Sequence, residues 1–160
     1  MALTREAPAP PDTLVIGIGN PLRGDDGAGA AVVGALPRRP HVRYLDVHQL
    51  LPELADDLLR AQRVVFIDAS VTAREVTVRP VLPGSGGHLG HQLSPETLLE
   101  LCRDAYGAVP PSAWLVEVPA SAFDLGAGLS PATARSVADA VARVAELAGR
   151  VPRQPASFLL

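Results

Sequence analysis

The sequence predicts a three-layer α/β/α sandwich built on a twisted, mostly parallel sheet of about five strands. Residues 13–18 and 63–68 are apolar almost throughout, which is typical of strands buried on both faces of a parallel sheet. Helical segments alternate with strand candidates along the chain, as they do in βαβ units. The 160 residues suffice for one domain with a proper core. We expect this domain to span residues 12–149, with flexible tails at 1–11 and 150–160.

Strands and helices alternate in the first half of the chain. In order, we predict a strand at 13–18, a helix at 28–36, a strand at 42–47, a helix at 50–60 and a strand at 63–68. The first helix is small and apolar, and Pro37 ends it. The second helix is amphipathic because four leucines share one of its faces. These leucines are Leu51, Leu54, Leu58 and Leu59.

Capping residues delimit the elements of the second half. In order, we predict an edge strand at 75–82, a helix at 95–105, a strand at 114–118 and a helix that starts at 131 and is capped by Gly149. Both helices begin with a Ser-Pro pair, at Ser94 and at Ser130, which places serine at the N-cap and proline at N1. Residues 83–92 form a glycine-rich loop with two histidines, His88 and His91.

Composition excludes several classes of protein. The 14 basic residues, all arginine, and 17 acidic residues give a net charge of −3, which disfavours a nucleic-acid partner. The absence of lysine excludes a P-loop and Schiff-base chemistry. The single cysteine, Cys102, rules out a disulfide framework and is expected to pack in the core. Without a secretory signal or a long apolar run, we expect a cytoplasmic protein with no membrane contact.

The loop after the first strand does not fit a dinucleotide site. Gly17 and Gly19 match the start of that fingerprint, but Leu22 replaces the third glycine. The loop then carries Asp25 and Asp26, which would repel phosphate groups. Either aspartate could cap the following helix, but capping explains one aspartate better than two. The surrounding glycines indicate a close approach of other groups, so a ligand or catalytic role for one of the pair remains open.

Polar side chains follow several strands of the predicted sheet. Asp25 and Asp26 follow the first strand, Asp68 ends the strand at 63–68, and His88 and His91 lie in a later loop. If these strand ends share one edge of the sheet, carboxylates and an imidazole meet in one crevice. Such a set suits a first-row divalent metal or acid–base catalysis. The alternatives are that Asp68 bonds backbone amides and that the histidines are surface residues.

Residues 17–29 (GIGNPLRGDDGAG) closely resemble the opening motif of the nickel–iron hydrogenase maturation endopeptidases. Three later segments agree with that family in order and spacing. They are 65–69 (VFIDA), 91–95 (HQLSP) and 123–131 (FDLGAGLSP). The resemblance covers about residues 13 to 148, nearly the whole expected domain.

The resemblance implies an α/β endopeptidase, often grouped as aspartic-type, that removes a C-terminal extension from the hydrogenase large-subunit precursor after nickel insertion. It assigns nickel recognition and catalysis to Asp26, Asp68 and His91, with the nickel delivered in the substrate. Nothing in the sequence demands more than a monomer, so we expect one. Asp26 is one methylene shorter than the Glu frequent in the family, which leaves Asp25 as a rival, and His88 is the weaker histidine. Whether the metal or a carboxylate activates water stays open.

Two other functions remain open at this point. A nickel-sensing checkpoint or chaperone for the immature large subunit would use the same three ligands without cutting. The segment Gly-Ile-Gly-Asn-Pro also resembles the start of peptidyl-tRNA hydrolases. That family has a histidine–asparagine pair shortly after the loop, and residues 23–27 contain neither.

Overall fold

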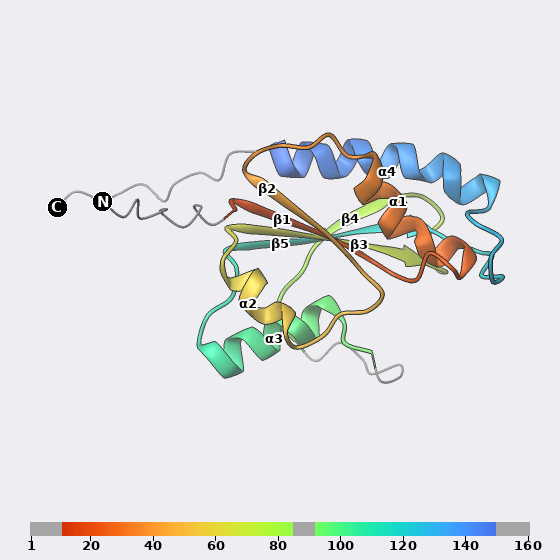
Figure 1. Ribbon diagram of the computed structural model, residues 1–160. Coiled ribbons are helices and arrows are strands. Elements are labelled where there is room, and N and C mark those ends of the chain that lie inside the picture. The colour runs from red at the N-terminus through yellow and green to blue at the C-terminus, as the bar shows by residue number, and fades with distance from the viewer. Residues whose placement is uncertain (1–10, 85–91, 150–160) are drawn as a thin grey trace, which may run out of the picture.

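The computed structural model describes residues 11–84 and 92–149, in which a five-stranded sheet has helices on both faces (Figure 1). In chain order, its elements are β1 (Thr13–Ile18), α1 (Ala28–Ala35), β2 (Val42–Val47), α2 (Leu54–Leu59), β3 (Arg63–Ser70), β4 (Thr77–Pro80), α3 (Pro95–Tyr106), β5 (Ser112–Pro119) and α4 (Pro131–Gly149). The expectations for His88, His91 and nearly all of the two tails concern residues outside the described ranges.

The strand order is β2-β1-β3-β5-β4. β4 pairs with β5 in the antiparallel direction, whereas the other three strand pairs are parallel. β4 is an edge strand, as the charges in its sequence predict. The predicted three-layer sandwich with a mostly parallel sheet is therefore confirmed.

Each face of the sheet has its own apolar core. Phe66 and its neighbours on one face pack under α2 and α3, and Cys102 is fully buried there, as predicted for a packing thiol. The opposite face holds Ile67 and packs under α1 and α4. Burial on both faces explains why β1 and β3 are apolar almost throughout.

Several predicted elements have different bounds in the structure: β4 spans Thr77–Pro80 rather than 75–82, β5 spans Ser112–Pro119 rather than 114–118, and α2 and β3 also differ. α2 begins at Leu54 rather than at residue 50, because Pro52 lies in the turn that precedes it. Leu51 is consequently 45% exposed, and its predicted place on the buried helix face is wrong. β3 continues past Asp68 to Ser70, because its pairing with β5 extends two residues beyond Asp68.

The amino end of α1 lies directly against the sheet because two glycines allow it. A Cβ atom on Gly17 would lie 2.5 Å from the carbonyl oxygen of Gly29. A Cβ atom on Gly29 would lie 2.7 Å from the backbone of Ile18 and 2.9 Å from the carbonyl oxygen of Ile67. These are backbone atoms of two neighbouring strands, so an added methyl group would push the helix off the sheet.

We therefore expect Gly29→Ala to lower the free energy of unfolding by about 2–3 kcal/mol through overpacking. Gly34→Ala in the same helix is the matched control, since nothing lies within 4 Å of its Cβ position. There alanine should stabilise the helix by about 0.5–1 kcal/mol. Urea denaturation of both variants measures the difference, and equal stabilities would contradict the close approach.

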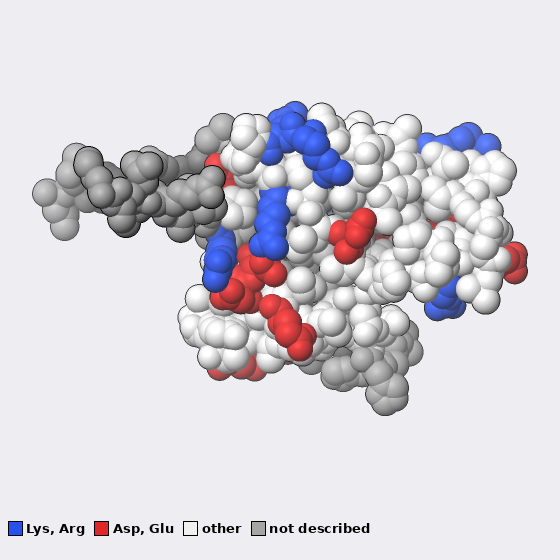
Figure 2. Space-filling view, in the orientation of Figure 1, with Lys and Arg blue, Asp and Glu red and all other residues white. Residues whose placement is uncertain are grey.

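No helix of residues 11–84 or 92–149 is long and apolar enough to cross a lipid bilayer. On the side of the molecule in Figure 2, arginines and acidic residues lie intermixed. Arg43, for example, pairs with Asp57, and Arg60 pairs with Asp56. The described surface in this view shows no continuous basic stripe that a nucleic-acid backbone would require.

Candidate active site

The strand order creates a crevice between the carboxyl ends of β1 and β3. The chain leaves β1 through α1 to reach β2 on one side, and it leaves β3 to reach β5 on the other. α1 and α3 consequently cover opposite faces of the sheet. Ligands of open α/β sheets bind at such switch points. The loop with Asp25 and Asp26 follows β1, and Asp68 lies in β3, so both predicted carboxylate positions flank this crevice.

The loop after β1 folds back so that Asp26 closes it. The Asn20 N–H donates a hydrogen bond of 2.7 Å to Asp26 Oδ2, and Asn20 Oδ1 accepts one of 3.0 Å from the Leu22 N–H. Gly19 has a φ of +129°, and a Cβ atom there would lie 2.0 Å from the Asp26 carbonyl oxygen. Glycine is thus required at this position for the loop to hold Asp26 beside the end of β1.

Asp25 is fully buried and joins two loops that are distant in sequence. Its Oδ2 accepts hydrogen bonds from the Ser121 N–H (2.9 Å), the Ala122 N–H (3.0 Å) and the Ser130 hydroxyl (2.9 Å). Its Oδ1 accepts one of 2.7 Å from the Ser130 N–H. α1 has no side-chain cap, so helix capping by either aspartate, considered above, is wrong.

Asp25 is therefore a structural carboxylate. Burial alone raises the pKa of Asp25, but the backbone hydrogen bonds from Ser121, Ser130 and Ala122 hold it well below its usual range. Its oxygens already accept four hydrogen bonds, whereas Asp26 is partly exposed and accepts one from Asn20. Asp26 is the member of the pair that remains free to bind a ligand.

The same contacts join the first motif to the loop at 120–130. The Asp25 N–H donates to the Ala122 carbonyl oxygen (2.7 Å), and the Gly126 N–H donates to the Leu22 carbonyl oxygen (2.9 Å). Two of the four motif segments thus form one rigid platform beside the crevice. Asp25 and the loop at 120–130 therefore have a structural role in positioning the first motif.

Asp68 lies on the sheet face that is covered by α2 and α3. Phe66, two residues earlier in β3, packs in that core, so Asp68 points to the same side. Burial raises the pKa of Asp68 to about 7, and the negative charges of Asp26 and Glu117 add to the effect against a backbone hydrogen bond from Ala69. Asp26 is therefore near enough to Asp68 for their charges to interact.

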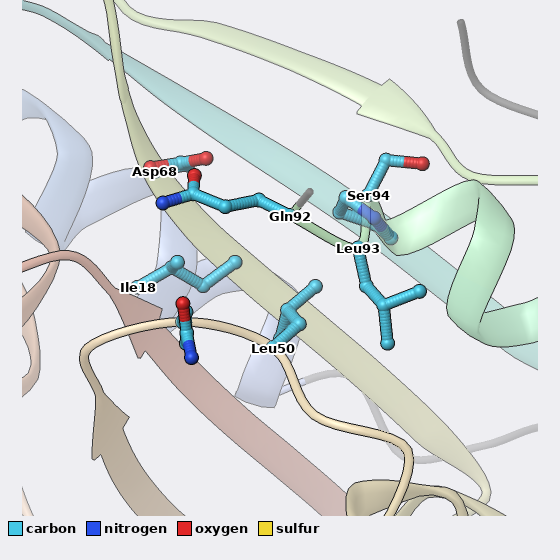
Figure 3. A pocket seen from close by; sticks show the side chains of 8 residues that line it. Ile18, Leu50, Asp68, Gln92, Leu93 and Ser94 are labelled. Carbon is cyan, nitrogen blue, oxygen red and sulfur yellow. The ribbon is translucent and has the colours of Figure 1, made fainter. Parts of the chain in front are cut away.

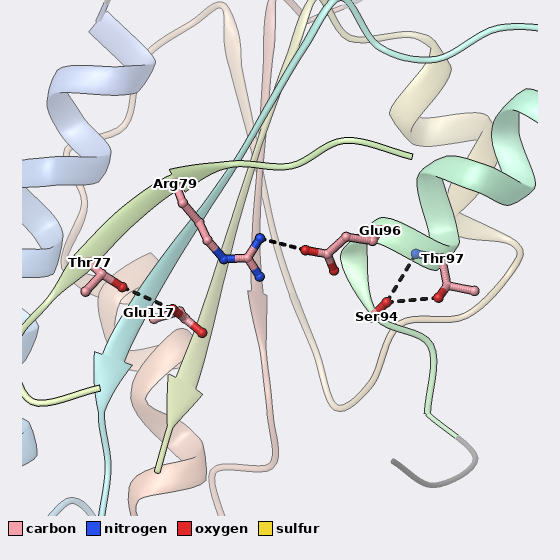
Figure 4. Close-up of polar contacts among 6 residues, drawn as sticks. All are labelled: Thr77, Arg79, Ser94, Glu96, Thr97 and Glu117. Carbon is pink, nitrogen blue, oxygen red and sulfur yellow. Dashed lines mark hydrogen bonds and ion pairs between the residues drawn. The ribbon is translucent and has the colours of Figure 1, made fainter. Parts of the chain in front are cut away.

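Glu117 is a third carboxylate of the crevice, and the sequence reasoning missed it. It is the register partner of Asp68 across the β3–β5 pair. The Thr77 hydroxyl of β4 donates a hydrogen bond of 3.1 Å to Glu117 Oε2 (Figure 4). The available signal was a glutamate in an otherwise apolar strand, but its place beside Asp68 depends on the strand order.

The start of α3 lies across a pocket from Asp68 and is held by two sets of contacts (Figure 4). Ser94 Oγ accepts a hydrogen bond of 3.1 Å from the Thr97 N–H, which confirms the predicted N-cap. Arg79 of β4 forms an ion pair of 2.7 Å with Glu96 in the first turn. The segment 92–95 that leads into α3 is thereby held against the carboxyl end of the sheet.

A pocket of about 200 Å³ opens between this segment and the end of the sheet (Figure 3). Ile18, Leu50 and Leu93 supply apolar walls, and Asp68 lies at its edge. The side chain of Gln92 extends toward the Asp68 carboxylate. The candidate site thus combines two interacting carboxylates with an adjoining, partly apolar pocket.

The structure describes two of the three predicted metal ligands. Asp26 and Asp68 flank one crevice, whereas His91 lies outside the described residues. Within residues 11–84 and 92–149, no three His, Cys, Asp or Glu side chains are grouped so that they could hold a metal ion. The role of His91 as the third ligand therefore stays a prediction.

Chemically, this arrangement can bind a cation or transfer a proton. Two neighbouring carboxylates in a partly buried crevice attract a positive charge, which would relieve their mutual repulsion. A carboxyl group with a pKa of about 7 can also gain or lose a proton near neutral pH, as Asp68 does. Either property is typical of a hydrolytic site.

The fold is similar to those of solved hydrogenase maturation proteases. HybD, the hydrogenase-maturating endopeptidase from Escherichia coli, is 23% identical with a TM-score of 0.67, covering 82% of this chain and 88% of that one. The [NiFe] hydrogenase maturation protease HycI from Thermococcus kodakarensis is 20% identical with a TM-score of 0.67, covering 86% and 92%. An endopeptidase from Escherichia coli solved in solution is 26% identical with a TM-score of 0.66, covering 82% and 88%.

No family model and no curated protein sequence matches the chain. At these identities the likeness establishes the fold, and it spans most of both chains in each pair. The chain thus has the fold of the hydrogenase maturation endopeptidases, which confirms the resemblance of its motifs at the level of structure.

Proposed function

We propose that this chain, with the fold of the hydrogenase maturation endopeptidases, removes the C-terminal extension of a nickel–iron hydrogenase large-subunit precursor. The main support for the proposal is the position of Asp26 and Asp68. Both lie at the switch point of the sheet, and a pocket opens beside Asp68. Asp25 is held by hydrogen bonds from the loop at 121–130, which supports Asp26 rather than Asp25 as the functional residue.

In this proposal, nickel belongs to the substrate, and Asp26, Asp68 and His91 complete its coordination. Carboxylate oxygen and neutral imidazole are suitable ligands for nickel. The electrostatic interaction of Asp26 with Asp68 supports the fit, since a divalent cation between them would offset the repulsion. A metal ion in such a site polarises the scissile carbonyl group or a bound water molecule.

The residues of the chain itself supply the remaining chemistry. A carboxylate can accept a proton from the attacking water, and a carboxyl group that is protonated near pH 7 can donate one to the leaving amine. This proton transfer is the alternative to activation of water by the metal, because a carboxylate that binds nickel is not free to exchange a proton. Without a metal between them, Asp68 has the pKa that suits the exchange, and Asp26 is its neighbour.

Intact-mass spectrometry of the precursor tests the proposal. We expect incubation of nickel-loaded precursor with the wild-type protein to reduce the precursor's mass by that of its C-terminal extension, while metal-free precursor stays whole. An unchanged mass together with a stable complex would favour the checkpoint or chaperone function. An unchanged mass without a complex would contradict both functions.

A further inference from the structure

We propose that the pocket beside Asp68 is a specificity subsite that receives one apolar side chain of the polypeptide substrate, from a residue adjoining the scissile bond. This inference rests on the proposed peptidase function and adds to it the residues that select the substrate. The pocket adjoins Asp68, so a side chain seated in it places its own backbone near the Asp68 carboxylate.

One part of the pocket wall is apolar and favours an apolar side chain, whereas the rest is polar. Ile18, Leu50 and Leu93 line it from three different segments: the end of β1, the turn before α2 and the approach to α3. Leu50 is 3% exposed and Ile18 is 8% exposed, so both are fixed parts of the core rather than mobile surface groups. Contact of an apolar side chain with them would be favourable because it removes apolar surface from water.

The size of the pocket fits a single side chain. Its volume is about 200 Å³. Small-molecule and cofactor sites usually occupy roughly 300–1,000 Å³, whereas an apolar cavity of about 150 Å³ already holds a benzene molecule. The pocket is therefore large enough for a side chain the size of leucine or phenylalanine.

Two amides at the rim match the backbone of an extended peptide. Gln49 and Gln92 both border the pocket and are exposed, and Gln92 extends toward the carboxylate of Asp68 (Figure 3). A glutamine amide donates and accepts hydrogen bonds, as a peptide group does. These side chains are positioned to hold the substrate backbone while the apolar walls receive its side chain.

The wall on the α3 side is rigid enough to discriminate between side chains. Pro95 begins α3, and the capping bond from the Thr97 N–H to Ser94 fixes the turn that follows Leu93. The ion pair between Arg79 and Glu96 ties the same turn to β4. Specificity from a preformed pocket of this kind typically gives 10–200-fold discrimination per methylene.

The experiment measures kcat and KM for nickel-loaded precursors in which the residue on either side of the scissile bond is changed to Ala, Leu, Phe or Asp. With the wild-type protein, we expect one of the two positions to prefer Leu over Ala by at least about 10-fold and over Asp by more. Leu93→Ala should shift this preference toward Phe. Leu101→Ala is its matched control, because Leu101 is also partly buried against the same core but does not line the pocket.

Gln92→Ala supplies a second, milder variant, since its side chain is exposed. We expect it to raise KM about 10-fold through lost hydrogen bonds, whereas Gln62→Ala before β3 should leave KM unchanged. Processing by the wild-type protein that is indifferent to both flanking residues, or an unaltered preference in Leu93→Ala, would overturn the subsite and leave the peptidase intact. No processing of any precursor would overturn the peptidase function, and the subsite with it.

Discussion

Replacing Asp25 by alanine is expected to lower the free energy of unfolding by about 3–5 kcal/mol. The substitution leaves four donors without their acceptor in a buried position, the N–H groups of Ser121, Ala122 and Ser130 and the Ser130 hydroxyl. It also removes every side-chain hydrogen bond by which Asp25 joins the loop after β1 to the loop before α4. Urea denaturation monitored by circular dichroism measures this loss.

The stability lost in Asp25→Ala should become smaller at acid pH. Hydrogen bonding holds the pKa of Asp25 below its unfolded value of about 3.9, so its contribution to stability is complete above pH 4 and declines as the pH falls further. The difference between wild type and Asp25→Ala should therefore shrink in acid. Asp124→Ala, an exposed residue of the same loop, should change stability by less than about 0.5 kcal/mol. A loss below about 1 kcal/mol in Asp25→Ala at neutral pH would contradict the structural role.

Asp68→Asn is expected to have the opposite effect on stability, and to stabilise the metal-free protein at pH 8 by about 2–4 kcal/mol. Burial and two neighbouring carboxylates raise the pKa of Asp68 to about 7, so the folded state disfavours its ionised form. The free energy of unfolding should fall as the pH rises from about 4 to 7 and should change little above 7 on this account. Asparagine carries no charge and removes this dependence.

Urea denaturation of the wild type and of Asp68→Asn at pH 5 and pH 8, with a chelator present, measures this difference in stability. Asp46→Asn on β2 is the control, because Asp46 is exposed. An Asp68→Asn variant that gains no stability over the wild type between pH 5 and pH 8 would contradict the account of its surroundings. We also expect the variant to lose processing activity, since active sites commonly retain groups that reduce stability.

Local patterns in the sequence were sufficient to predict most of the fold. The apolar segments of β1 and β3 require burial on both faces, and the Ser94-Pro95 pair marks the first turn of α3. The predicted start of α2 was wrong because the leucine pattern extends upstream of the helix, through Pro52 and the turn that precedes Leu54. Periodicity alone does not record where a helix begins.

The site was harder to predict, because its geometry depends on contacts between distant segments. Nothing local to Asp25 and Asp26 distinguishes them, and only the loop around Ser130 shows which one is structural. Glu117 becomes relevant because β5 lies next to β3, and strand order is not legible in a single sequence. Asp68 was found because a carboxylate near the end of an apolar strand is a strong local signal.

The central claim is that Asp26 and Asp68 act as one functional unit at the switch point of the sheet. The most direct test is the rate of precursor processing, followed by intact-mass spectrometry, for Asp26→Asn, Asp68→Asn and the double variant, with Asp124→Asn as the control. We expect each single variant to remain folded and to lose at least about 10³-fold in rate, and the double variant to be no slower than the singles, as residues of one unit behave. Wild-type processing in either folded single variant would contradict the claim.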